Sequence, residues 1–161
     1  MLKNINYSKI LFFDIETVPQ TFDYNELDER GQGLWDRKTR CIQERENLNA
    51  EEVYEKAGIY AEFGKVVCIS LGFVLQKEGE TQIRIKSIAN EDEITLLQEF
   101  LDLLNSYYNS PDFLFCAHNG KEFDIPFLCR RILINNLKIP YMLNVSGKKP
   151  WEIKHLDTME L

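Results

Sequence analysis

The segment 10–19, with the sequence ILFFDIETVP, constrains the fold of this chain more than any other stretch. Four apolar residues precede two carboxylates, Asp14 and Glu16, which are separated by one residue, and a proline ends the run. Such a run predicts a buried β-strand, whose alternate side chains point to opposite faces. Asp14 and Glu16 are therefore expected on one face of the strand, where the two carboxylates can share a divalent cation.

Two interpretations of this acidic pair are open. Asp14 and Glu16 can mark an ordinary strand end, with the aspartate capping a turn and the glutamate in solvent. Alternatively the pair binds metal, because anions at the end of a core strand are costly to desolvate unless cations compensate them. A second acidic segment, AHNGKEFDIPFL at 117–128, favours the metal site, since it follows another apolar run and places Asp124 where a helix is expected to begin.

Together, FFDIETVP and HNGKEFDIPFL resemble the first two motifs of the DEDD (DnaQ-like) 3'-5' exonuclease superfamily, especially the branch related to the proofreading domains of family B DNA polymerases. The resemblance spans most of the chain, and the motifs stand in the expected order. It implies an α/β, RNase H-like fold with a mixed central β-sheet flanked by α-helices. It also implies a metal-dependent 3'-5' exonuclease that hydrolyses phosphodiester bonds at single-stranded nucleic acid 3' ends, with DNA favoured over RNA.

The resemblance further assigns roles to individual residues. Asp14, Glu16 and Asp124 would be the catalytic metal ligands, and their oxygen donors suit Mg²⁺ or Mn²⁺ in a two-metal site. His118 is expected to be a structural neighbour of the site rather than a ligand. The residues expected to contact the substrate are Ile15, Thr17, Asn119, Lys121 and Phe123.

One part of the superfamily pattern is not found in the sequence. Members carry a third motif, a Tyr or His followed several residues later by an Asp, which supplies the general base and a fourth carboxylate. His155 and Asp157 are too close together to be that motif, which leaves Asp157 as a peripheral acid at most. We therefore expect a single domain, 1–161, that ends before the third motif and hydrolyses poorly. The alternatives are a nucleic-acid-binding or structural module of the same fold without turnover, and an RNase H-like endonuclease.

The composition indicates a globular domain with a substantial core, because 44% of the 161 residues are hydrophobic. The net charge of −7 argues against a broadly basic nucleic-acid-binding surface, although a site that attracts Mg²⁺ must itself be acidic. The basic excess lies in residues 117–161, which carry seven basic and five acidic side chains. This excess predicts a cationic groove near the site, formed by Lys121, Arg130, Arg131, Lys148 and Lys149. Ordinary solvated charge is the alternative for the last two lysines.

The remaining sequence signals concern cellular setting. Four widely spaced cysteines and two histidines include no CxxC pair, so neither a zinc site nor disulfides are expected. The sequence contains no signal-peptide pattern and no apolar run of about 20 residues that could span a bilayer. We therefore expect a cytoplasmic protein without a membrane partner.

The pattern of apolar residues predicts further strands at 66–74, 81–88 and 113–117, and helices at 94–104 and 123–136. A strand that passes into a helix start is expected at 155–161. The segment 20–62 is rich in charge, is interrupted by Gly31 and Gly33, and predicts a surface insertion with a helical piece near 50–60. This insertion is either a solvated excursion or a flap over the active site, for which Trp35 and Tyr54 are the aromatic candidates.

Overall fold

The computed structural model describes residues 5–160 of the chain. The chain forms two compact units. Unit 1 combines Met1–Glu16 with Val66–Leu161, and unit 2 is the intervening segment Thr17–Lys65. Unit 2 contains the segment 20–62, for which the sequence predicts an insertion.

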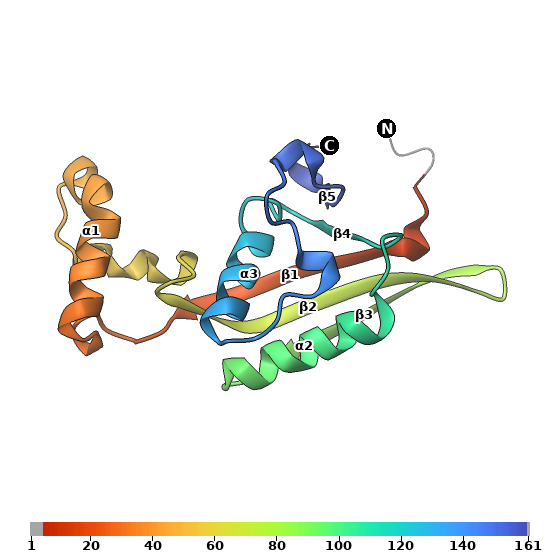
Figure 1. The fold of residues 1–161 in the computed structure, drawn as a ribbon, viewed down its shortest axis with the longest axis horizontal. Helices are drawn as coiled ribbons and strands as arrows, with labels where there is room; N and C mark the ends of the chain where they lie inside the picture. Colours follow the sequence, from red (N-terminus) through yellow and green to blue (C-terminus); the bar gives the residue numbers. More distant parts are fainter. Residues whose placement is uncertain (1–4, 161) are drawn as a thin grey trace. The chain divides into compact units, whose positions relative to one another are not determined.

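A mixed β-sheet, with five strands in the described residues, organises unit 1 (Figure 1). The strand order is β3-β2-β1-β4-β5. β2 and β3 form an antiparallel hairpin, whereas β4 is parallel to both β1 and β5. The predicted α/β fold with a mixed central sheet is therefore confirmed. The strands are β1 (Ile10–Pro19), β2 (Gly64–Lys77), β3 (Glu80–Ala89), β4 (Leu114–Ala117) and β5 (Leu156–Asp157).

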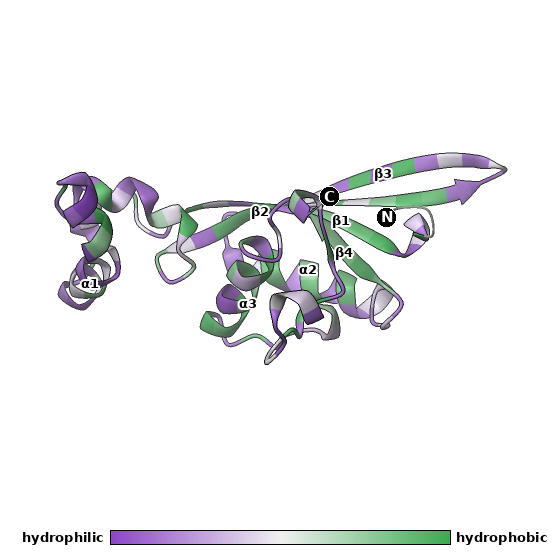
Figure 2. Cartoon of the chain, turned by 90° about the horizontal axis from the view of Figure 1, so that it is seen from above, coloured by the Kyte–Doolittle hydropathy of each residue, from purple (hydrophilic) through white to green (hydrophobic). Residues whose placement is uncertain are grey.

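Two helices of unit 1, α2 (Glu93–Tyr107) and α3 (Asp124–Ile134), lie on the same side of the sheet (Figure 2). α2 begins where the sequence predicts a helix, because Asp92 caps its first turn by accepting the N–H of Thr95 at 3.0 Å. Its apolar side chains recur at helical spacing and are buried. α3 accommodates Pro126 in its first turn, where the missing N–H removes no helical hydrogen bond.

Burial alternates along β1, as a strand covered on one face requires. Leu11, Phe13 and Ile15 are buried, whereas Asp14 and Glu16 are exposed. The two carboxylates therefore share the face of the strand that is turned away from the buried core.

The same face of the sheet exposes apolar side chains of the β2–β3 hairpin. In the antiparallel register Ile85 lies opposite Gly72 and Ile83 lies opposite Val74, and both isoleucines are exposed. A shallow cavity of ≈ 380 Å³ lies on this face, and its lining includes Phe12, Asp14, Gly72, Ile85 and His118. Unit 1 thus presents an apolar surface beside an exposed acid.

Unit 2 has its own hydrophobic core, formed around Trp35 of α1 (Glu29–Glu46). The Trp35 indole N–H donates to the carbonyl of Ala50 at 2.7 Å, and its ring packs edge-on against Tyr54 and Phe63. The interpretation of Trp35 and Tyr54 as exposed flap aromatics is wrong, because both side chains are buried in this core.

The helix α1 was not expected, since Gly31 and Gly33 suggest an interruption. Two features stabilise the helix despite the glycines. Asp28 is its N-cap and accepts the N–H of Gly31 at 2.6 Å, and Trp35 and Thr39 are buried one turn apart. The helical piece predicted near 50–60 is present as the 3₁₀ helix η3 (Glu52–Ile59). None of the helices in the described residues combines the length and the apolar character needed to cross a membrane.

Candidate active site

The candidate site lies where β1 continues beyond its pairing with β4. The parallel register runs from Ile10 opposite Leu114 to Phe12 opposite Cys116. Farther along β1, the backbone N–H of Ile15 donates to Oδ1 of Asp124 at 3.2 Å. A side chain thus supplies the acceptor for this strand N–H, and the contact joins the two acidic segments recognised in the sequence.

Asp124 is held at this position by α3, of which it is the first residue. It is only 3% exposed, whereas Asp14 and Glu16 are exposed on β1. Burial, followed by the negative charges of Asp14 and Asp157, raises the pKa of Asp124 to about 6, although backbone hydrogen bonds oppose this rise. The carboxylates of Asp14 and Asp124 therefore lie close enough to repel each other.

The donor chemistry of this site fits a hard divalent cation. Asp14 and Asp124 offer carboxylate oxygens, and a cation beside them would compensate the charge of the buried Asp124 carboxylate, whose pKa is raised by burial first and by the charge of Asp14 second. Within residues 5–160, however, no three His, Cys, Asp or Glu side chains converge as a ready ligand cluster. The hydrogen bond from Ile15 places Asp124 beside the strand segment that carries both Asp14 and Glu16.

The loop between β4 and α3 carries most of the residues expected to contact substrate. Asn119 is exposed and adopts a left-handed backbone conformation with φ of 59°. Gly120 is required next to it, because a Cβ atom there would lie 2.4 Å from Cβ of Ala117. Phe123 is half-buried, and its ring packs against that of Phe127 with centroids 5.5 Å apart.

Lys121 and His118 both have side-chain partners near the site. Nζ of Lys121 lies 2.7 Å from a carboxylate oxygen of Glu160, and the lysine side chain is only 10% exposed, so its charge is largely compensated. Nδ1 of His118 lies 2.8 Å from Oγ1 of Thr158. Thr17 follows Glu16 in β1 and is half-buried.

Asp157 lies in β5, and its carboxylate accepts hydrogen bonds from the loop rather than projecting freely. Oδ1 accepts the N–H of Asn119 at 2.8 Å, and Oδ2 accepts the N–H of Lys121 at 3.1 Å. Sequence reasoning identified Asp157 as a peripheral acid but missed this contact with the loop. The only sequence signal was an aspartate within a predicted strand, where a buried carboxylate needs hydrogen-bond donors.

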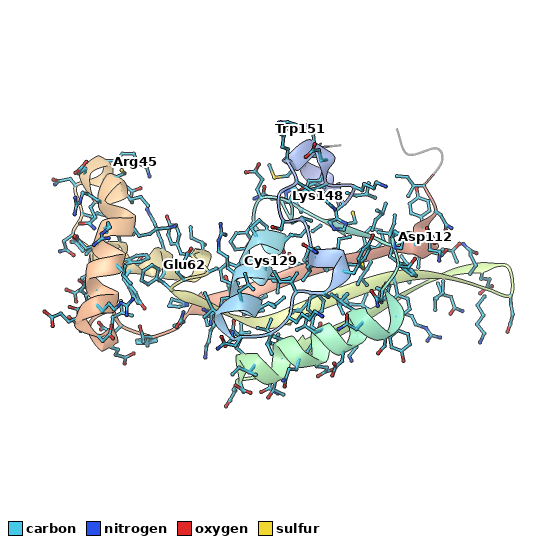
Figure 3. All side chains as sticks on the ribbon, viewed as in Figure 1. Arg45, Glu62, Asp112, Cys129, Lys148 and Trp151 are labelled. Atoms are coloured by element: carbon cyan, nitrogen blue, oxygen red, sulfur yellow. The ribbon has the colours of Figure 1, made fainter. Side chains whose placement is uncertain are left out.

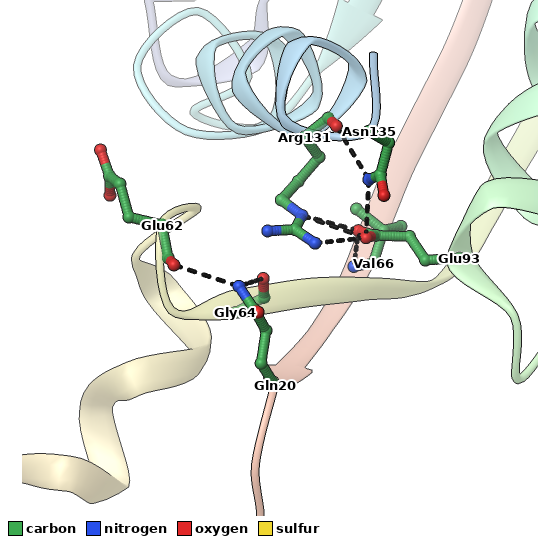
Figure 4. Close-up of polar contacts among 7 residues, drawn as sticks. All are labelled: Gln20, Glu62, Gly64, Val66, Glu93, Arg131 and Asn135. Carbon is green, nitrogen blue, oxygen red and sulfur yellow. Dashed lines mark hydrogen bonds and ion pairs between the residues drawn. The ribbon is translucent and has the colours of Figure 1, made fainter. Parts of the chain in front are cut away.

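The predicted cationic groove needs one correction. Arg131 is buried and bonded to Glu93 of α2, with its Nε at 2.9 Å and 3.2 Å from the two carboxylate oxygens (Figure 4). It is therefore an internal ion-pair partner and cannot face a phosphate backbone. Arg130, Lys148 and Lys149 are exposed.

An aromatic residue that sequence reasoning missed lies beside these lysines. Trp151 is 77% exposed, and Nζ of Lys149 lies 5.2 Å from the centroid of its ring. Figure 3 shows Lys148 and Trp151 on the segment that precedes β5. The sequence KKPW was a usable signal, because lysines beside an aromatic residue are typical of single-strand binding surfaces.

A comparison with curated proteins found no match. Residues 59–161 match a family described as a predicted 3'-5' exonuclease related to the exonuclease domain of PolB. The matched range contains β2 to β5 and therefore Asp124, and it begins after the strand that carries Asp14 and Glu16. With this match over more than half of its length and with a mixed α/β sheet of the RNase H-like type, the chain belongs to the family of predicted 3'-5' exonucleases related to the PolB exonuclease domain.

Proposed function

We propose that the chain forms a metal-dependent exonuclease domain that removes nucleotides from single-stranded 3' ends, with DNA preferred over RNA. One observation carries the proposal: Asp124 is buried and accepts the N–H of Ile15, one residue from Asp14, so the two acidic motifs meet at one place. Family membership supports the exonuclease class. The preference for DNA rests on the resemblance to polymerase proofreading domains.

Asp14, Glu16 and Asp124 would hold Mg²⁺ or Mn²⁺. When bound, such an ion lowers the pKa of a coordinated water and compensates charge on the phosphate. The chain's own contribution is orientation: the hydrogen bond from Ile15 fixes the Asp124 carboxylate, and exposure of Asp14 leaves its oxygens accessible. Asn119 and Phe123, on the loop that leads to Asp124, would contact the terminal nucleotide.

The second candidate is a module of the same fold that binds nucleic acid without hydrolysing it. One observation favours it: within residues 5–160, no three His, Cys, Asp or Glu side chains converge on one point.

An assay with a single-stranded oligonucleotide labelled at its 5' end, in the presence of Mn²⁺, separates these functions. The exonuclease predicts a ladder that shortens from the 3' end, is stronger for DNA than for RNA, and is lost in Asp14→Ala. The matched control is Glu44→Ala, an exposed acid of α1, which should leave the ladder unchanged. Internal fragments would indicate an endonuclease, and binding without products would indicate the non-hydrolysing module.

A further inference from the structure

The segment 155–160, here called the C-terminal clasp, is bonded along its length to the segment 115–121. His155 begins the series, since its Nδ1 accepts the N–H of Phe115 at 3.1 Å. Asp157 follows, and its carboxylate accepts the N–H groups of Asn119 and Lys121. Oγ1 of Thr158 lies 2.8 Å from Nδ1 of His118. The clasp therefore holds the end of β4 and the loop that leads from it to Asp124.

Asp157 is the central residue of the clasp. It is 5% exposed, and its Oδ1 also accepts the N–H of Met159 at 3.0 Å. Although burial raises it, the pKa of Asp157 is lowered overall by the backbone N–H groups of Lys121, Met159 and Asn119. The side chain is therefore an ionised acceptor at neutral pH, and its oxygens are already engaged by three donors.

The loop that Asp157 holds passes directly into the helix that carries Asp124. It contains Asn119 with a φ of 59°, in the left-handed region that asparagine adopts more readily than most non-glycine residues. The carbonyl of Asn119 accepts the N–H of Phe123 at 2.9 Å, and the carbonyl of Gly120 accepts that of Ile125 at 2.9 Å. The bonds run without a break from Asn119 into the first turn of α3, where Asp124 lies.

We propose that Asp157 is a positioning residue for the active site: it fixes the loop 119–121 and, through it, the placement of Asn119 and Asp124. The inference rests on the proposed function, and it differs from the expectation that Asp157 is a spare metal ligand. A ligand would bind the cation directly. A positioning residue acts through the loop, as outer-shell partners of metal ligands do, and their loss typically costs on the order of 10- to 100-fold in metal affinity.

Two variants of Asp157 test the proposal. Asp157→Asn removes the charge and replaces one acceptor oxygen by an N–H₂ group that cannot accept. Asp157→Glu keeps the charge but displaces both oxygens by one methylene, and it also serves if the asparagine variant fails to fold. We expect both to lower Mn²⁺ affinity, measured by calorimetry, by about 10- to 100-fold. A role through charge alone would leave Asp157→Glu unchanged.

Amide hydrogen exchange in the metal-free protein gives a readout that is independent of metal binding. In Asp157→Glu, protection of both the Asn119 and the Lys121 amide proton should fall about tenfold or more, because both acceptor oxygens are displaced. In Asp157→Asn at least one of the two amide protons should lose protection to the same extent, because only one oxygen remains to accept. Leu104→Ala, a cavity variant in the core of α2, is the matched control for lost stability and should leave the relative protection of these two amides unchanged. If wild-type protein binds no Mn²⁺, the proposed function fails while the exchange result still tests the positioning role. Wild-type protection of Asn119 and Lys121 in both Asp157 variants would overturn the inference.

Discussion

Asp124 is the residue through which pH should act most directly on unit 1. Its folded-state pKa of about 6 lies above its ordinary value of 3.8, chiefly because it is buried. The folded protein therefore binds more protons than the unfolded chain between these values, and this stabilising contribution is lost as pH rises from about 4 to about 6. We expect Asp124→Asn to remove the loss and to stabilise the metal-free protein at neutral pH by about 1–3 kcal/mol.

Urea denaturation in EDTA, repeated from acid to neutral pH, measures this effect. Asp102→Asn, an exposed acid of α2, is the control and should keep the wild-type pH dependence. Mn²⁺ should reverse the order, since it stabilises the folded protein that binds it and Asp124→Asn would bind it more weakly. The same pH dependence in Asp124→Asn as in wild type would contradict the role given to this carboxyl.

Gly120 offers a second test at the scale of one residue. Because its added Cβ would meet Cβ of Ala117 at 2.4 Å, Gly120→Ala must displace backbone and should cost about 1–3 kcal/mol of folding free energy. The control is Gly72→Ala in β2, whose nearest neighbour would be Cβ of Phe12 at 3.5 Å, an ordinary contact. Equal unfolding midpoints for the two variants would show that the loop can shift to accommodate the added Cβ atom at little cost in folding free energy.

Single residues also show what the sequence could and could not predict. The resemblance of the two acidic motifs to those of one superfamily predicts that they meet, and the hydrogen bond from Ile15 to Asp124 joins them. Arg131 was placed in the cationic groove because of the basic excess in residues 117–161, although its spacing of seven from Asp124 puts both residues on one helix face. The partner of Lys121 is Glu160, 39 residues away, and no local pattern predicts such a contact.

At the scale of elements, a buried ion pair joins α2 to α3. The carboxylate of Glu93 accepts hydrogen bonds from the guanidinium of Arg131, from the side-chain amide of Asn135 at 2.9 Å and from the backbone N–H of Val66 at 2.8 Å (Figure 4). Against the opposing effect of burial, the hydrogen bonds to Arg131 and Val66 lower the pKa of Glu93. Its stabilising contribution is therefore present above the ordinary value of 4.5 and is lost as pH falls through the lowered value.

We expect Glu93→Gln to cost about 3–5 kcal/mol, because it removes the carboxylate charge that faces the buried Arg131 guanidinium. Chemical denaturation of unit 1 measures the loss. Lys86→Gln breaks the exposed pair with Glu99, at 2.8 Å, and should cost less than about 1 kcal/mol. Similar losses of folding free energy for the two variants would mean that breaking the buried Glu93–Arg131 pair costs no more than breaking an exposed pair.

The elements themselves were predicted unevenly. α2 was predicted because its apolar periodicity and its N-cap residue Asp92 both indicate a helix. The β2–β3 hairpin was predicted because its apolar residues follow strand patterns. α1 was missed because its sequence is strongly polar, and its stability comes from burying Trp35 against η3, a contact between segments that the sequence does not place together. Gly31 and Gly33 do lower the helix propensity of this segment, but the tertiary packing of Trp35 outweighs that cost.

At the scale of the whole molecule, the two units have separate hydrophobic cores. Trp35→Ala should remove the centre of the unit 2 core, at a cost of about 3–5 kcal/mol to that unit. Hydrogen exchange followed by mass spectrometry should then show lost protection in peptides from 17–65 and unchanged protection in peptides from α2 and α3. Loss of protection throughout the chain would instead mean that the units fold as one cooperative body.

The distribution of tryptophan has a practical consequence for such experiments. The chain has two, and each unit contains one: Trp35 is 0% exposed, whereas Trp151 is 77% exposed. Trp35 should therefore emit at shorter wavelength and resist acrylamide, while Trp151 emits at longer wavelength and is readily quenched. The protein thus carries two separable optical probes: Trp35 would report melting of unit 2, and Trp151 would report whether an oligonucleotide binds beside Lys149.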